Sequence, residues 1–185
     1  QWDSIMNYDA FMEPVTWFLT GMEKHSDSYN GGIWGDGEAF FNAMGYHMSR
    51  MQTNTVMTAM NQLSNHDHSR FLTRTNQVVG RTGTLGPEKA SENVKLPVFR
   101  EAVVIQMTWP GAPTIYYGDE AGVFGWTDPD NRRTFPWGKE DLELTEFHRY
   151  LTGIRNRTPA FRRGALKPLL AENGVIAYGR FDADG

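Results

Sequence analysis

The sequence predicts an α/β fold built around a parallel sheet, and two observations lead to this prediction. Short apolar segments with strand character alternate along the chain with helical patterns, at residues 2–8, 55–64 and 114–117. Polar side chains end or follow each of these segments, at residues 7–9, 65–67 and 118–120. In parallel α/β folds the functional site is built at the carboxyl ends of the strands. Periodicity alone does not decide between an open sheet and a closed barrel.

Helical spacing of apolar residues predicts the helices that separate these strands. They cover residues 9–23, 38–52, 96–109 and 139–158. The second helix carries a stripe of phenylalanine and methionine that is typical of a core face. The third has Pro97 in its first turn, where its missing N–H costs nothing. The last has acidic residues at its start and basic ones at its end, as the helix dipole favours.

The pattern changes after Pro159, where residues 165–185 predict a β-hairpin. Its turn lies at residues 172–174, and its second strand covers residues 175–181. We therefore expect a domain boundary near residues 158–161. The hairpin is too short to form a core of its own, so it is interpreted as the start of another domain.

The composition argues against several classes of function. The net charge is −4, with both signs interspersed, so neither nucleic acid nor a membrane surface is an expected partner. No apolar run approaches the ~20 residues of a membrane helix, and no signal peptide is visible. The absence of cysteine excludes disulfides and thiolate metal sites. Trp34, Trp126 and Trp137 lie in loop-like sequence, where they serve either as faces for sugar rings or as buried anchors.

Titratable groups are concentrated in residues 63–74, LSNHDHSRFLTR. Asn65, His66 and Asp67 offer an amide, an imidazole and a carboxylate, a set that can hydrogen-bond adjacent hydroxyls. An equally good interpretation is a strand-end cap, in which Asp67 accepts backbone N–H groups of the next helix. A zinc site is disfavoured, because His66 and His68 lack ligand spacing and the other histidines lie far along the chain.

Two further segments carry candidate polar groups. Asp119 and Glu120 follow the third apolar segment, and a structural role at a turn or with an arginine is the favoured interpretation. Residues 128–131, Asp-Pro-Asp-Asn, are residue types that strongly favour a turn. Either Arg132 or Arg133 can then present its guanidinium to a carboxylate or to paired sugar hydroxyls. The alternative is a solvated ion pair that stabilises the loop by at most ~1 kcal/mol.

Taken together, these segments resemble the α-amylase family of glycoside hydrolases. Residues 63–74 are similar to the family motif at the seventh barrel strand, and residues 111–122, GAPTIYYGDEAG, to the eighth strand and its exit loop. Residues 3–8, DSIMNY, and 127–137, TDPDNRRTFPW, resemble the neopullulanase and cyclomaltodextrinase branch. The four motifs occur in the family order and span nearly the whole chain.

The resemblance implies a particular fold class. The chain is expected to be the C-terminal part, about strands six to eight, of a (β/α)8 TIM barrel that runs into a C-terminal β-sandwich domain. Residues 1–160 would form a partial catalytic barrel, and residues 161–185 the beginning of the β domain. Strands one to five are not expected in this chain. Their absence would leave barrel strands exposed, so we also expect self-association through them.

The resemblance also assigns chemistry. Family members cleave or transfer α-glucosidic bonds with retention, using a nucleophile after strand four and a general acid/base after strand five. Asp67 matches the third carboxylate, which stabilises the transition state, and His66 matches a histidine that binds the same sugar. Asp128 and Arg132 match positions that hold neighbouring glucose units, with Arg133 as a competitor for Arg132.

This assignment predicts the remaining properties of the protein. The substrate would be an α-glucan or maltooligosaccharide, and the chain alone, without nucleophile and acid/base, would be inactive. No metal ligand or cofactor is expected in this chain. Calcium binding is an open expectation for the full-length enzyme only. The branch suggests a cytoplasmic location. The alternative function is a non-catalytic carbohydrate-binding module that keeps Asp67, His66 and the loop aromatics.

Overall fold

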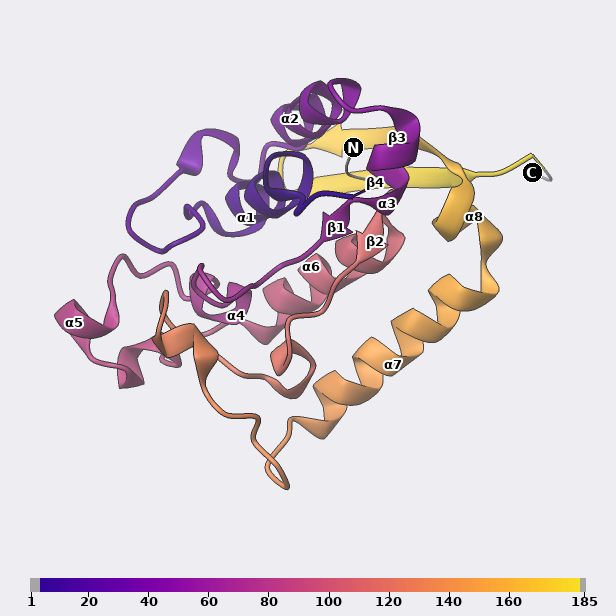
Figure 1. Ribbon diagram of the computed structural model, residues 1–185. Coiled ribbons are helices and arrows are strands. Elements are labelled where there is room, and N and C mark those ends of the chain that lie inside the picture. Colours follow the sequence, from indigo (N-terminus) through magenta and orange to yellow (C-terminus); the bar gives the residue numbers. More distant parts are fainter. Residues whose placement is uncertain (1–3, 184–185) are drawn as a thin grey trace.

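The computed structural model describes residues 4–183 and shows a short parallel sheet flanked by helices, with a β-hairpin at one side (Figure 1). The longer helices are α1 (Glu13–Thr20), α2 (Gly37–Ser49), α6 (Leu96–Thr108) and α7 (Leu142–Arg157). Shorter helices are α3 (Thr53–Thr58), α4 (Phe71–Arg74), α5 (Thr82–Leu85) and α8 (Pro159–Arg163). Single turns are η1 (Tyr8–Met12), η2 (Gly31–Ile33), η3 (Glu88–Ala90), η4 (Asp119–Ala121) and η5 (Asp130–Arg132). The strands are β1 (Met60–Asn61), β2 (Ala112–Pro113), β3 (Ala165–Glu172) and β4 (Val175–Phe181).

The sheet at the centre is parallel, as the alternation of strands and helices predicts. β1 pairs with β2, with Met60 opposite Ala112. Met6 forms a parallel bridge to Met60 on the other side of β1. The three segments therefore lie in the order in which they occur in the sequence, each followed by helical structure, which is the connectivity of a barrel or doubly wound sheet. Residues 2 and 3 of the first predicted strand lie outside the described part of the chain.

Two predicted strands are wrong in extent. The first part of the segment predicted as a strand at residues 55–64 belongs to α3 (Thr53–Thr58), and β1 contains only two residues. A short apolar run suits a helix as well as a strand, so periodicity could not separate them. The strand predicted at residues 114–117 is not formed there, because β2 contains only Ala112 and Pro113. Ile115 and Tyr117, which follow β2, are about 40% exposed.

Buried amide side chains connect the three parallel segments. Asn7 donates through Nδ2 to Asn61 Oδ1 at 2.8 Å, and Asn61 donates through its own Nδ2 to the carbonyl of Pro110 at 2.8 Å. Gly111 is required beside this chain of hydrogen bonds: its φ is +128°, and a Cβ there would lie 2.5 Å from Asn61 Nδ2. Because a buried amide without a partner is costly, this arrangement fixes the register of the strands.

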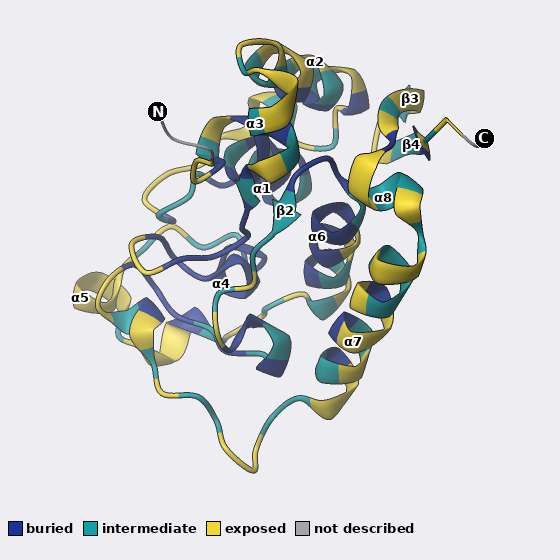
Figure 2. Ribbon diagram, turned by 45° about the vertical axis from the view of Figure 1, so that its right-hand side comes forward, coloured by how far each residue is buried: buried dark blue, intermediate teal, exposed yellow. Residues whose placement is uncertain are grey.

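The core lies between the sheet and helices α1, α2, α6 and α7. It is formed by the apolar faces of these helices; its fully buried members include Phe11, Phe40, Met44, Phe99 and Trp109. Figure 2 shows α6 buried over most of its surface, whereas α7 buries one face and exposes the other. In residues 4–183, no helix has both the length and the apolar character needed to cross a bilayer.

The predicted hairpin is present as β3 and β4, joined by a two-residue turn at Asn173-Gly174. It packs on α2 and α8 rather than standing free (Figure 1), and Tyr178 links it to the end of α6. The Tyr178 ring lies 5.0 Å from that of Trp109, and its hydroxyl is 2.6 Å from the hydroxyl of Thr108. Burial raises the pKa of Tyr178 to about 12. The start of a C-terminal β domain at residue 161 stays a prediction.

Candidate functional site

The motif at residues 65–68 forms a tight turn after β1. The side-chain oxygen of Asn65 accepts the backbone N–H groups of Asp67 at 2.9 Å and His68 at 3.0 Å. This turn directs the Asp67 side chain outward, with 54% of its surface exposed. The Oδ1 atom of this carboxylate lies 3.4 Å from His66 Nε2. Asp67 is thus presented by a rigid backbone and keeps room for a ligand.

The interpretation of Asp67 as a helix cap is wrong. The helix after the motif, α4, begins at Phe71 and has Arg70 at its N-cap position. The N–H of Phe71 donates instead to the hydroxyl of Ser64 at 3.0 Å. Since Ser64 supplies the acceptor for the helix start, the Asp67 carboxylate is not used for that purpose.

The structure brings the four predicted site residues together. Arg132 donates through Nε to the carbonyl of His66 at 3.1 Å and forms an ion pair with Asp128, 2.9 Å from Oδ1. The backbone N–H of Asp128 lies 3.5 Å from the carbonyl of Asp67. All four side chains are about half exposed. They therefore form an open, polar surface at the carboxyl end of β1.

Arg133 is turned away from this surface, whereas Arg132 contacts it. Its guanidinium binds the carboxylate of Asp130 and the carbonyl of Pro87, and it lies 4.5 Å from the centre of the Phe124 ring. Arg133 therefore holds the loop to the preceding segment, whereas Arg132 faces the motif. The loop after β2 presents a single arginine to the candidate site.

Asp119 has the structural role that the sequence favoured. Its carboxylate pairs with Arg70 at 2.9 Å, and both side chains are buried. Arg70 also donates to the carbonyls of Tyr117 at 2.6 Å and Asn131 at 2.9 Å. Burial outweighs the arginine and raises the pKa of Asp119. Arg70 thus binds Asp119 and the backbone of two segments, and it orders the loops around the site.

Tyr8 is a member of the site that the sequence did not assign. Its hydroxyl accepts a hydrogen bond from Asn65 Nδ2 at 3.1 Å, and burial together with the charge of Asp67 raises its pKa. Lys24 lies 5.5 Å from the centre of its ring. The sequence places Tyr8 at the end of the first predicted strand, where a site residue is expected. A single sequence could not distinguish Tyr8 from its polar neighbours Asn7 and Asp9.

His68 is not part of the polar surface. Its ring is buried between Tyr8, at a centroid distance of 5.0 Å, and His25, at 4.7 Å. Burial, helped by the positive charge of Arg74, lowers the pKa of His68 to about 3. His68 is therefore neutral at physiological pH and serves as packing beneath the motif. Although His25 is far along the chain, the fold places it beside this histidine.

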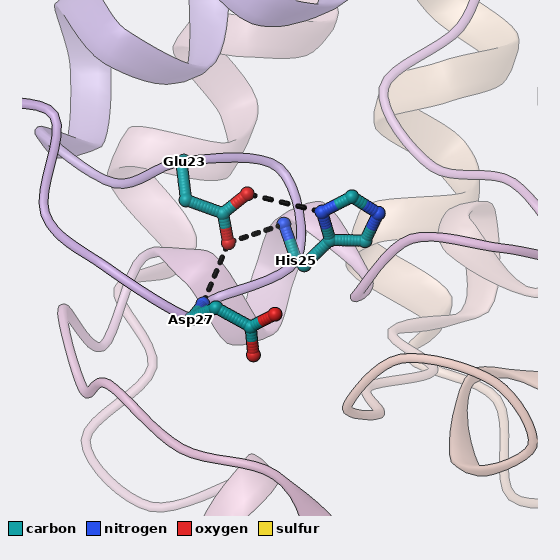
Figure 3. A group of neighbouring side chains, drawn as sticks. All are labelled: Glu23, His25 and Asp27. Atoms are coloured by element: carbon teal, nitrogen blue, oxygen red, sulfur yellow. Dashed lines mark hydrogen bonds and ion pairs between the residues drawn. The ribbon is translucent and has the colours of Figure 1, made fainter.

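One group of possible metal ligands occurs in residues 4–183, formed by Glu23, His25 and Asp27 (Figure 3). The Glu23 carboxylate accepts the backbone N–H groups of His25 at 2.7 Å and Asp27 at 2.6 Å, and it lies 3.1 Å from His25 Nδ1. Asp27 is paired with Arg81, which lowers the Asp27 pKa. These oxygens already have partners, so the arrangement fits a loop clamp better than a metal site.

The fold and the site together indicate a class of protein. Parallel strands followed by helices, with an exposed carboxylate where a strand ends, are the arrangement of TIM-barrel and related α/β enzymes. The model of the α-amylase catalytic domain matches residues 3–162. The chain therefore belongs to the α-amylase family of TIM-barrel glycoside hydrolases.

Individual relatives agree with this assignment. The chain is 34% identical over 180 residues to neopullulanase 2 of Thermoactinomyces vulgaris, covering 96% of the chain and 26% of that protein. It is 42% identical over 125 residues to amylopullulanase of Thermoanaerobacter thermohydrosulfuricus, covering 66% of the chain and 8% of that protein. The crystal structure of the debranching enzyme of Nostoc punctiforme superposes with a TM-score of 0.80 at 27% identity, covering 99% of the chain and 35% of that structure. The chain thus spans at most about a third of each of these proteins.

The buried pair of Arg70 and Asp119 predicts a large loss of stability in Asp119→Asn. Removal of one partner leaves the other charge buried without compensation, which costs about 3–5 kcal/mol of unfolding free energy. Urea denaturation followed by circular dichroism measures this loss. Asp128→Asn is the matched control, because its half-exposed pair with Arg132 is worth about 0–1 kcal/mol. Equal losses in the two variants would contradict the structural role of Asp119.

The neutral state of His68 predicts destabilisation in acid. Between pH 6.5 and about 3, the unfolded chain takes up a proton at this histidine and the folded chain does not. The unfolding free energy should therefore fall as pH decreases through this range, by up to about 1.4 kcal/mol per pH unit. Urea melts at successive pH values should show a smaller slope for His68→Asn than for the exposed control His66→Asn. Identical slopes would refute this explanation.

Proposed function

We propose that this chain forms the substrate-stabilising part of a retaining glycoside hydrolase that acts on α-glucans or maltooligosaccharides. The observation that carries the proposal is the Asp67 carboxylate. It is half exposed at the end of β1 and held by a side-chain turn, and His66, Asp128 and Arg132 surround it. The similarity to neopullulanase and amylopullulanase supports the choice of an α-glucan as substrate.

Asp67 would act on the sugar ring and not on the bond that breaks. Positive charge develops on the ring in the oxocarbenium-like transition state of glycoside hydrolysis. A carboxylate that hydrogen-bonds a ring hydroxyl binds the transition state more tightly than the ground state, and only such differential binding accelerates the reaction. The exposure of Asp67 leaves its oxygens available for this contact. His66, 3.4 Å away, would bind a hydroxyl of the same glucose unit.

Asp128 and Arg132 would hold an adjacent glucose unit. Their ion pair is half exposed and lies against the motif through the His66 carbonyl. A sugar with neighbouring hydroxyls can accept a hydrogen bond from the guanidinium and donate one to the carboxylate. The pair therefore offers complementary groups for a pair of ring hydroxyls, which would position the substrate without taking part in bond cleavage.

We further propose that the three parallel segments are strands six, seven and eight of the barrel. Retention requires a nucleophile and an acid about 5–5.5 Å apart on either side of the bond. The resemblance assigns those groups to strands four and five, which these 185 residues would not contain. The open surface around Asp67 is consistent with a site that other barrel segments complete. The chain alone should therefore not hydrolyse a glucan, and none of its own residues is proposed to hold a metal or cofactor.

Replacement of Asp67 by Asn in the complete enzyme tests this proposal. The variant should lose several kcal/mol of transition-state stabilisation, which corresponds to a decrease of about a thousandfold in kcat on a maltooligosaccharide. Glu143→Gln, at a highly exposed carboxylate on α7, is the matched control and should leave kcat unchanged. Wild-type turnover in Asp67→Asn would refute the assigned role. If the unaltered enzyme binds maltooligosaccharides without cleaving them, the alternative function of a carbohydrate-binding module is the correct one.

The exposed edges of the sheet predict that the isolated chain self-associates. Met6 on one side and Ile115 and Tyr117 on the other are partly exposed apolar residues beside strand segments that lack a described neighbour. Light scattering should give a mass well above the 21.0 kDa of one chain. Ile115→Lys places a charge on this edge and should reduce the association. A stable, monodisperse monomer of the unaltered chain would contradict the prediction.

A further inference from the structure

The structure treats the three loop tryptophans differently. Trp126 is completely buried, and its indole N–H donates to the carbonyl of Gly86 at 3.0 Å. Trp34 is partly exposed and packs against Gly21. Trp137 is 82% exposed, the largest exposure among the large hydrophobic side chains of residues 4–183. Trp126 is thus a packing anchor, whereas most of the surface of Trp137 contacts no described residue.

Trp137 and Phe135 form an aromatic pair at the tip of the loop between η5 and α7. Their ring centroids are 4.5 Å apart, with the planes inclined by 48°. The backbone N–H of Trp137 donates to the carbonyl of Phe135 at 2.9 Å, and that of Lys139 to the carbonyl of Pro136 at 2.8 Å. These bonds form a tight turn around Pro136 that holds the two rings next to each other.

The loop that carries this pair is anchored at its base. The Tyr117 hydroxyl donates to the carbonyl of Arg133 at 2.8 Å, and the Arg133 guanidinium binds Asp130. The same loop begins with Asp128 and Arg132, which face the motif. In Figure 1 it projects at the bottom of the molecule, on the side toward which the chain runs after β2. The aromatic pair therefore lies on the same loop as Asp128 and Arg132, and the base of this loop is held by hydrogen bonds.

We propose that Phe135 and Trp137 form an outer glucose-binding subsite. A glucose unit of the α-glucan, farther along the chain than the unit held by Asp128 and Arg132, stacks on the exposed face of Trp137. Glucose presents apolar C–H groups on its ring faces, and a fixed aromatic surface binds them with little loss of side-chain entropy. This inference rests on the proposed function, because it extends the same substrate-binding surface.

Chain-length dependence in the complete enzyme tests the subsite. Trp137→Ala should lower kcat/KM for maltoheptaose about three- to tenfold, mainly through KM, because an aromatic contact of this kind contributes that much. Maltotriose is too short to reach the platform, so its kcat/KM should change less than about twofold. Trp137→Phe should restore most of the loss. Tyr150→Ala removes an exposed aromatic ring from α7 and is the matched control, expected to affect neither substrate.

Several results would overturn the proposal. An equal loss for both oligosaccharides, or no loss for either, would show that Trp137 does not recognise chain length. A decrease in melting temperature typical of a lost core aromatic would show that Trp137 packs against another segment of the protein. If the unaltered enzyme cleaves neither oligosaccharide, the proposed function fails. The platform is then tested by 19F NMR of protein labelled with 5-fluorotryptophan, where maltoheptaose must shift the Trp137 resonance and the absence of a shift contradicts the subsite.

Discussion

The buried guanidinium of Arg70 is the interaction on which the site depends. It follows the Asp67 turn by three residues and binds the segment after β2 through Asp119 and the Tyr117 carbonyl. It also donates to the carbonyl of Asn131. The side-chain Nδ2 of Asn131 in turn donates to the carbonyls of Asn65 and His68 in the motif. Because the guanidinium and most of its partners are shielded from water, these hydrogen bonds are costly to break. One side chain thus fixes three loops against each other.

This arrangement separates residues that order the site from residues that are available to a ligand. Arg70 and Asp119 are buried and pair with each other, and burial keeps His68 neutral by lowering its pKa to about 3. Asp67 and Arg132 are half exposed on the surface that the buried groups support. A transition-state stabiliser needs this combination, because its contribution depends on oxygens that are already oriented before the substrate binds.

The sequence predicted the parallel α/β organisation, the long helices and the hairpin, because amphipathic periodicity and turn residues are local signals. It also predicted that His66, Asp67, Asp128 and Arg132 belong together, through the motifs of a family. It could not assign the extents of the strands, since a two-residue strand such as β1 has no periodicity. The partner of Arg70 and the position of Tyr8 depend on contacts between distant segments, which one sequence does not encode in a local pattern.

The central claim is that Asp67 stabilises the transition state through a ring hydroxyl of the substrate. The most direct test compares two enzymes on two substrates. The value of kcat/KM is measured for the complete enzyme and for its Asp67→Asn variant, each with α-glucosyl fluoride and with the 2-deoxy analogue of this substrate. Hydrogen bonds to the 2-hydroxyl strengthen in the transition state of glycoside hydrolysis. The substitution should therefore lower kcat/KM strongly for α-glucosyl fluoride. It should lower kcat/KM much less for the 2-deoxy analogue, in which the hydroxyl is already absent. Equal losses on both substrates would contradict the claim.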